Sequence, residues 1–144
     1  MVAVQRVVRT RTPLESVVSY LADFTHAEQW DPGTKSCTRL DSGPLGEGST
    51  WRNVSEFRGN ETELTYTLVT RTADRLVFQG ENKTVTSTDD LHFAAIDGGT
   101  EITYDANLNF HGVAKLAAPF LKAEFERLGA EVEKTLPAVL DDLS

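Results

Sequence analysis

The clearest pattern in the sequence is an alternation of apolar and polar residues with a period of two, which is typical of β-strands that are covered on one face. Near the end of the chain, one face carries Ile102, Tyr104, Ala106, Leu108 and Phe110, and the other carries Thr103, Asp105, Asn107 and Asn109. The same alternation appears at Leu64, Tyr66 and Leu68. The pattern predicts an antiparallel sheet that packs on one side only.

Short β-like runs separated by turn residues fill most of the chain and predict seven strands. An opening strand is expected at 2–10, and six more near 34–41, 48–57, 61–71, 75–81, 84–95 and 100–109. Turn-forming residues mark the breaks, at Ser42-Gly43-Pro44 with Gly46 and Gly48, Arg58-Gly59-Asn60, Ala73-Asp74, Gly80-Glu81-Asn82 and Asp97-Gly98-Gly99. The spacing indicates strands that are connected by hairpins.

Two short helices are expected directly after the first strand. Thr12 is predicted to cap the first helix, with Pro13 at its first position and Glu15 completing a capping box. Residues 25–28 repeat the capping-box pattern before Trp30. The turn-forming residues 31–33 then end the second helix.

The chain beyond residue 112 is predicted to be helical to its end. An apolar stripe at helical spacing is formed by Leu121, Phe125, Leu128, Val132, Leu136 and Val139. Pro119 and Pro137 interrupt this pattern, and we expect a bend or a fresh start near Pro119. The long helix is expected to cover the apolar face of the sheet, which makes the fold class α+β.

Composition limits the classes of function. The 144 residues suit a single domain, 1–144, and the net charge of −8 disfavours nucleic acid and anionic membranes as partners. Cys37 is the only cysteine, so it is expected to be a structural thiol in a reducing compartment. Without an apolar run of about 20 residues, no membrane insertion is expected, and we place the protein in the cytoplasm. The sequence leaves a homodimer open.

The order of these elements resembles the START-like helix-grip superfamily, also called SRPBCC, and within it the polyketide cyclase/dehydrase-like proteins. The resemblance covers nearly the whole chain and rests on residues 12–15, 24–32, 43–51 and 97–104 in this order. It implies a curved seven-stranded sheet wrapped around the C-terminal helix. It also implies a cavity for a lipid, sterol, polyketide or plant hormone, without implying any one reaction.

Strand phase suggests which residues face such a cavity. The strand candidates are Trp51, Asn53, Tyr66, Phe78, Tyr104, Leu108 and Phe110, with Trp30 at the entrance and Phe120 and Glu124 from the long helix. The alternative for each of these aromatic residues is a place in a filled core, because regularly spaced aromatic side chains usually serve packing.

Asp89 is the principal candidate for chemistry, together with Tyr66 and Tyr104. It shares the phase of Leu91 and Phe93, so in a regular strand it points into the cavity, where burial would raise its pKa and suit it to general acid or base work. The alternative is a bulge or a strand edge at residues 88–90, which would leave the carboxylate in water.

No motif of the sequence indicates a metal or cofactor. The three histidines, of which His92 is expected to face solvent, lack the spacing of a metal site, and the glycines at 43–48 match neither phosphate-binding motif. We expect a metal-free protein without a cofactor.

Three functions stay open at this point. The first is binding of a hydrophobic small molecule, and the second is a polyketide cyclase or dehydratase that uses polar cavity residues. The third is a protein-interaction module of the co-chaperone type, for which the sequence suggests no large exposed apolar patch. An open cavity with several convergent polar groups would favour the enzyme, and an apolar cavity would favour the carrier.

Overall fold

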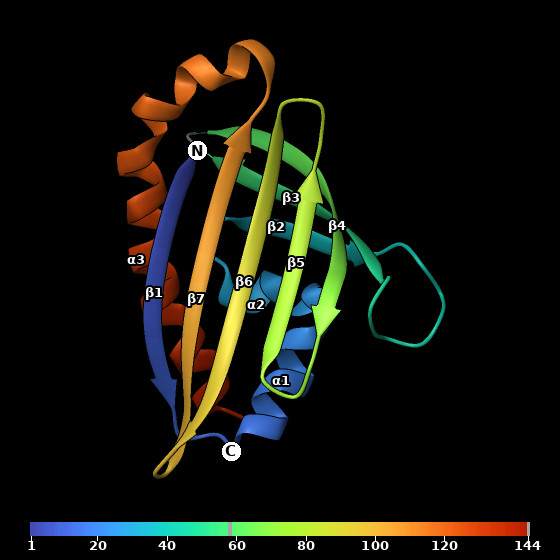
Figure 1. Cartoon of the computed structure of the whole chain (residues 1–144), viewed down its shortest axis with the longest axis vertical. Helices are drawn as coiled ribbons and strands as arrows, with labels where there is room; N and C mark the ends of the chain where they lie inside the picture. The colour runs from blue at the N-terminus through green and yellow to red at the C-terminus, as the bar shows by residue number, and fades with distance from the viewer. Residues whose placement is uncertain (58, 144) are drawn as a thin grey trace.

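One antiparallel sheet of seven strands organises the part of the chain that the computed structural model describes, residues 1–57 and 59–143. The strands are β1 (Val2–Thr10), β2 (Thr34–Arg39), β3 (Thr50–Phe57), β4 (Asn60–Arg71), β5 (Arg75–Glu81), β6 (Val85–Ile96) and β7 (Gly99–Phe110). Their order across the sheet is β1-β7-β6-β5-β4-β3-β2 (Figure 1). Seven predicted strands are thereby confirmed. Arg58, in the predicted turn between β3 and β4, lies outside the described residues.

The strand register sets the direction of each side chain. β6 pairs without interruption with β5 on one side and β7 on the other, and Asp89 lies opposite Phe78 and Ala106. Burial alternates along β6, with Asp89, Leu91 and Phe93 buried and His92 exposed. The alternative of a bulge or an edge at residues 88–90 is therefore wrong, because unbroken pairing on both sides keeps the period of two.

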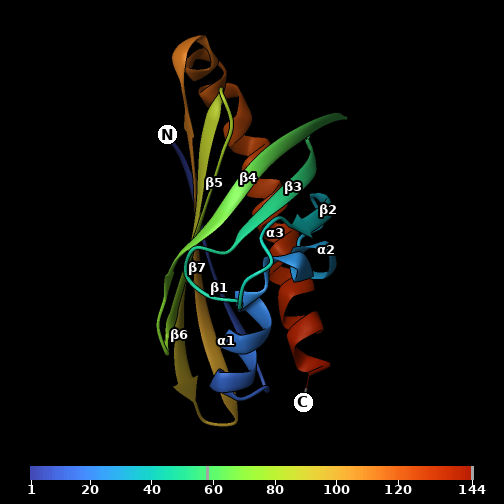
Figure 2. The ribbon, with the colours of Figure 1, turned by 90° about the vertical axis from the view of Figure 1, so that its right-hand side faces the viewer.

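Two short helices follow β1, as predicted, and a 3-10 turn joins them. They are α1 (Leu14–Ala22) and α2 (Ala27–Trp30), with η1 (Phe24–His26) between them. Together they form a helical corner on the concave side of the sheet (Figure 2). In this corner Val17, Leu21 and Phe24 are buried against the strands.

The predicted helix caps are wrong. The N-cap position of α1 is Pro13, without a side-chain cap, and the Thr12 hydroxyl instead donates to the carbonyl of Leu140. The Asp23 carboxylate, not Thr25, caps η1 by accepting from the Thr25 amide at 3.0 Å. Thr12 is fully buried beside the last turn of the C-terminal helix, where the Leu140 carbonyl accepts from the Leu143 amide as well as from the Thr12 hydroxyl.

The C-terminal helix begins afresh at the expected proline. The 3-10 segment η2 (Gly112–Ala117) leads into α3 (Ala118–Asp141), in which Pro119 occupies the first turn. Pro137 lies inside α3, which nevertheless continues to Asp141. α3 runs beside β1 and across the concave face of the sheet (Figures 1 and 2), so the predicted α+β arrangement is confirmed.

The concave face is filled at one end and open at the other. Val132, Leu136 and Leu140 of α3 are buried in the core, whereas Leu121 and Phe125 in its first half are only partly buried. The helical corner completes the filled end. The first half of α3 spans the open end, and the cavity lies beneath it.

Candidate functional site

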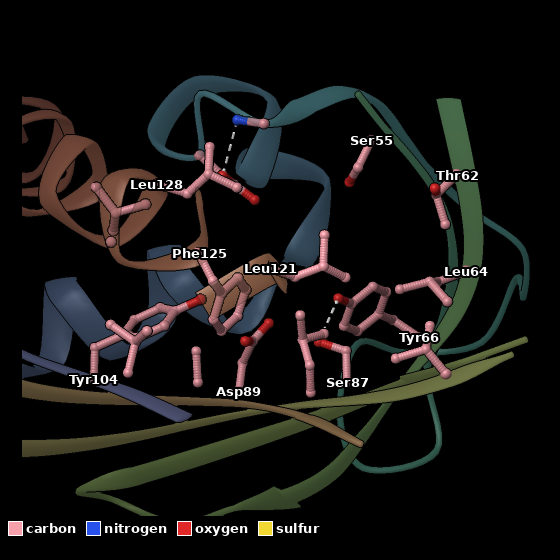
Figure 3. A pocket seen from close by; sticks show the side chains of 18 of the residues that line it. Ser55, Thr62, Leu64, Tyr66, Ser87, Asp89, Tyr104, Leu121, Phe125 and Leu128 are labelled. Carbon is pink, nitrogen blue, oxygen red and sulfur yellow. Dashed lines mark hydrogen bonds between the residues drawn. The ribbon is translucent and has the colours of Figure 1, made fainter. Parts of the chain in front are cut away.

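A cavity of about 200 Å³ lies between the first half of α3 and the concave face of the sheet (Figure 3). The sheet contributes the apolar side chains Val4, Leu64, Val85, Ala106, Leu108 and Phe110, and α3 contributes Leu121, Phe125, Leu128 and Val132. Most of this lining is apolar, so water in the cavity finds few hydrogen-bond partners. An apolar ligand is stabilised there because its surface is removed from water.

Several polar side chains from the sheet line this cavity, and Ser55, Glu56 and Thr62 are among them. Tyr66 of β4, Ser87 and Asp89 of β6, and Tyr104 of β7 all line it, and Figure 3 shows Ser87 and Asp89 pointing from the sheet towards Leu121 and Phe125 of α3. The Tyr66 hydroxyl donates to the Ser87 hydroxyl at 3.2 Å. These groups supply hydrogen-bonding atoms to a largely apolar space.

Tyr66 owes its position to a glycine on the neighbouring strand. Gly80 lies opposite Tyr66 in the β4–β5 pairing, and a Cβ at Gly80 would lie 2.6 Å from the Tyr66 ring. The ring of Phe24 packs on Tyr66 with a centroid distance of 4.6 Å. The absence of a side chain at Gly80 thus makes room for the ring that carries the hydroxyl.

Asp89 is the most perturbed carboxyl group of the cavity. Its side chain is 6% exposed, and burial raises its pKa to about 7; the charge of Asp31 adds to the rise, and a hydrogen bond with Tyr104 opposes it. Burial also raises the pKa of Tyr66 and of Tyr104 well above the usual value, with the charge of Asp89 as the next cause. Near neutral pH, Asp89 can therefore either give or take a proton.

Asp31 brings a second carboxylate to the cavity lining. Its two oxygens accept from the Gly33 amide and the Thr34 hydroxyl, each at 3.0 Å. Burial raises its pKa, and these two hydrogen bonds act in the opposite direction. Because both oxygens are already bonded, Asp31 is held in place and acts on Asp89 through its charge.

Arg6 is the cationic side chain of the lining. It forms an ion pair with Glu126 of α3 at 3.0 Å, and its Nε lies 3.7 Å from Glu133. This Nε is buried and has no hydrogen-bond partner among the described residues. Arg6 thus joins β1 to α3 at the cavity wall.

Of the ten side chains that the sequence suggested for ligand contact, four line this cavity. They are Tyr66, Tyr104, Leu108 and Phe110. All four lie on β4 or β7, where the apolar and polar residues alternate most regularly. Contact with a ligand stays a prediction for each of them.

Trp30, Trp51 and Phe78 belong to the core instead. Each is at most 2% exposed and lies outside the cavity lining. Phe24 of η1 is in ring contact with all three, with centroid distances of 6.2, 6.1 and 4.6 Å respectively. The expectation of an entrance at Trp30 is corrected for the same reason, because the helical corner covers this half of the concave face.

The other three candidates also lie outside the cavity lining. Asn53 is buried and bonded within the protein, donating to Thr34 at 3.2 Å and accepting from Ser55 at 2.6 Å. Phe120 is 78% exposed, and Glu124 bonds with Arg127. Phe120 and Glu124 lie outside the lining because α3 directs Leu121 and Phe125 towards the sheet instead.

The cavity also contains polar residues that were not among the sequence candidates. Ser87 shares the phase of Asp89, and Arg6 shares the phase of the buried Val4 and Val8, so each carried a readable signal. A charged residue at an inward position of a strand is such a signal. No local sequence pattern marked Asp31, because its position at the cavity depends on how the helical corner packs against the sheet.

The cysteine and the residue types that bind metals are further candidates for a site. Burial raises the pKa of the Cys37 thiol to about 12, as suits a structural thiol. Within residues 1–57 and 59–143, no three His, Cys, Asp or Glu side chains gather as metal ligands would. No helix in that part of the chain is long and apolar enough to cross a bilayer.

Comparison with protein families gives a match over residues 1–136. The matching family is described as polyketide cyclase / dehydrase and lipid transport. A comparison with curated protein sequences finds no match.

Solved structures share the fold at low sequence identity. A START superfamily protein from Mycobacterium smegmatis is 15% identical, with a TM-score of 0.80 and coverage of 99% of each chain. The Zhui aromatase/cyclase from Streptomyces sp. R1128 is also 15% identical with a TM-score of 0.80, covering 96% of this chain and 93% of that one. At this identity the likeness concerns the fold alone.

Proposed function

Since the chain belongs to the polyketide cyclase / dehydrase and lipid transport family, whose members typically bind hydrophobic ligands, we propose that it binds a compact, largely apolar small molecule in the cavity beneath α3. The polar end of the ligand lies against Asp89 and Tyr104. The observation that carries this proposal is the apolar cavity with a buried carboxyl group at its floor.

The size and lining of the cavity narrow the class of ligand. Its volume of about 200 Å³ is below the roughly 300–1,000 Å³ of sites for drug-sized ligands. A molecule of one or two rings, or a short acyl chain, suits this space. The carboxyl of Asp89 and the hydroxyls of Tyr66 and Tyr104 can each form a further hydrogen bond beyond those within the protein, so a ligand with a hydroxyl or carbonyl group is favoured over a pure hydrocarbon.

Blocking the cavity tests the binding function. Ala106 is 8% exposed and lines the cavity, so Ala106→Trp fills it, and binding of 2-naphthol followed by fluorescence is expected to weaken at least tenfold. Ala94→Trp is the matched control, because Ala94 is exposed on the neighbouring strand β6. Native mass spectrometry and solvent extraction of the purified wild type would identify any molecule that it retains.

Two outcomes would contradict the proposal. One is a wild type that binds no naphthol, fatty acid, sterol or aromatic polyketide. The other is equal binding by the Ala106→Trp and Ala94→Trp variants, which would place the probe outside the cavity.

A second candidate function is acid–base catalysis on the bound molecule, as in a cyclase. It is favoured by Asp89, a carboxyl with a pKa near neutrality that faces an enclosed space beside Tyr104. The Asp89 carboxylate would take a proton from a carbon beside a ligand carbonyl. The electron pair of that C–H bond would form a C–C bond to a second carbonyl carbon, and the proton would pass to the oxygen of that carbonyl.

Asp89→Asn separates catalysis from binding. The amide keeps the shape of the carboxyl but cannot take the proton, so turnover of a linear polyketone is expected to fall at least a hundredfold while its affinity changes little. The wild-type rate is expected to rise with pH around the pKa of about 7. A variant with unchanged turnover, or a wild type that converts no polyketone, would leave binding as the function.

A further inference from the structure

The segment that leads into α3 exposes three large apolar side chains to solvent. We call residues 111–122 the arch; Figure 1 shows η2 and the start of α3 curving around one end of the molecule. Val113, Leu116 and Phe120 are 87, 76 and 78% exposed, and among the described residues only Met1 is similarly exposed for a large apolar side chain. The sequence had suggested no such patch.

The arch is also a basic stretch in an acidic protein. Residues 111–122 contain Lys115 and Lys122 and no Asp or Glu, although the whole chain carries a net charge of −8. Just beyond the arch, Glu124 bonds with Arg127, and Glu126 with Arg6. Since charges more than about 8 Å away are largely screened at physiological salt, the local positive charge decides what approaches the arch.

We propose that the arch docks on an anionic lipid bilayer. Val113, Leu116 and Phe120 enter the headgroup region, while Lys115 and Lys122 face the lipid phosphates. The arch adjoins the cavity, because Leu121 follows Phe120 directly and lines it. The proposal goes beyond ligand binding, since it states where the protein meets the source of an apolar ligand.

A second copy of the chain fits the patch less well than a bilayer does. Three side chains offer only a few hundred Å² of apolar surface, whereas a stable dimer buries roughly 800 Å² on each partner. A bilayer needs no complementary pocket, and a few inserted side chains with nearby lysines suffice for peripheral binding. The combination of apolar and basic residues matches the chemistry of an anionic membrane surface.

Co-sedimentation with vesicles tests the proposal directly. We expect the full chain to bind vesicles of phosphatidylcholine and phosphatidylglycerol in a 3:1 ratio, and to bind pure phosphatidylcholine vesicles much more weakly. Binding to the anionic vesicles is expected to fall as salt is added. The Ala106→Trp variant, whose cavity is filled, separates docking from uptake of a lipid into the cavity: if the arch docks on the bilayer, this variant sediments with the vesicles as the wild type does.

Two sets of variants separate the apolar and the basic contributions. Leu116→Asp with Phe120→Asp is expected to weaken binding at least tenfold, while Leu40→Asp, at a leucine 54% exposed in the β2–β3 loop, is expected to leave it unchanged. Lys115→Gln with Lys122→Gln is expected to weaken binding to the anionic vesicles roughly 30-fold. Circular dichroism checks that each variant is folded.

Three results would overturn the proposal. The first is a wild type that stays in the supernatant with both kinds of vesicle. The second is unchanged vesicle binding by the folded Leu116→Asp/Phe120→Asp variant. The third is a wild-type dimer in size-exclusion chromatography with light scattering that this variant does not form, because the patch would then bind a second copy of the chain.

Discussion

At the scale of single residues, Asp89 lowers the stability of the fold when it is charged, and it supplies a protonatable group to the cavity. Its carboxyl group is buried at the cavity floor between Ser87 and Leu91 of β6, and a charge there loses its hydration. Because its pKa is about 7, Asp89 stays protonated at pH values below 7 at which an exposed carboxyl group is already ionised. Such a group is costly to keep, which supports a role in binding or chemistry.

The cost of Asp89 can be measured through the pH dependence of stability. Because its pKa is higher in the folded than in the unfolded state, the folded state binds more protons between about pH 4 and 7, and the free energy of unfolding falls as the pH rises through this range. Asp89→Asn removes this loss. As the pH rises from about 5 to 8, the free energy of unfolding of the variant should increase by roughly 2–3 kcal/mol relative to that of the wild type, as measured by urea unfolding.

Asp105→Asn is the control for this measurement, because Asp105 lies one residue out of phase with Tyr104 and bonds with Gln5 on the other face of the sheet. It shows what removing a carboxylate from the other face does to the free energy of unfolding. A stability difference between Asp89→Asn and wild type that stays constant with pH would contradict the assignment of the raised pKa to Asp89.

At the scale of elements, the contact between α3 and β1 sets the height of the cavity roof. Gly129 of α3 approaches Val4 so closely that a Cβ at Gly129 would lie 2.7 Å from Val4 Cγ1. Further along, the Thr10 hydroxyl donates to Asp141 at 2.6 Å. α3 is thus held against β1 from Gly129 to its end, while its first turns lie over the cavity.

Gly129→Ala tests this contact. The added methyl group must displace Val4 or lift α3, so we expect a loss of about 1–3 kcal/mol in the free energy of unfolding. Val4→Ala removes the clashing methyl groups. In a double-mutant cycle, the two substitutions should therefore be at least about 1 kcal/mol less destabilising together than their sum. Additive effects would show that the two residues do not limit the approach of α3.

At the scale of the whole molecule, the concave face is divided between a core and a cavity. The helical corner fills one half, and Phe24 contributes a ring that packs against Trp30, Trp51, Tyr66 and Phe78. The other half has only the first part of α3 above it. Stability is therefore expected to depend on the filled half, and function on the open half.

A pair of matched substitutions tests this division. Phe24→Ala removes a ring that is 2% exposed and should lower the free energy of unfolding by about 3–5 kcal/mol. Phe120→Ala removes a ring that is 78% exposed and should change it by less than about 0.5 kcal/mol. Chemical denaturation measures both. Similar losses for the two variants would mean that Phe120 packs against the protein in solution.

The sequence by itself determined the strands and the direction of their side chains. Period-two alternation is a local property of the extended backbone, so it placed Asp89, Tyr104 and Leu108 on the inward face before any packing was known. Pro119 likewise marked the start of α3 through its fixed φ angle and missing N–H group. The same reading applied to β1 would have found Arg6 as a charged residue on the inward face.

Only the tertiary structure decided which inward residues form the core and which line the cavity. Trp51 and Phe78 share the concave face with Tyr104, yet the helical corner covers the first two. Alternation identifies the face but not the partner, because the partner comes from distant segments of the chain. The same limit applies to Phe120, whose exposure depends on how α3 lies over the sheet, a long-range contact that no local pattern records.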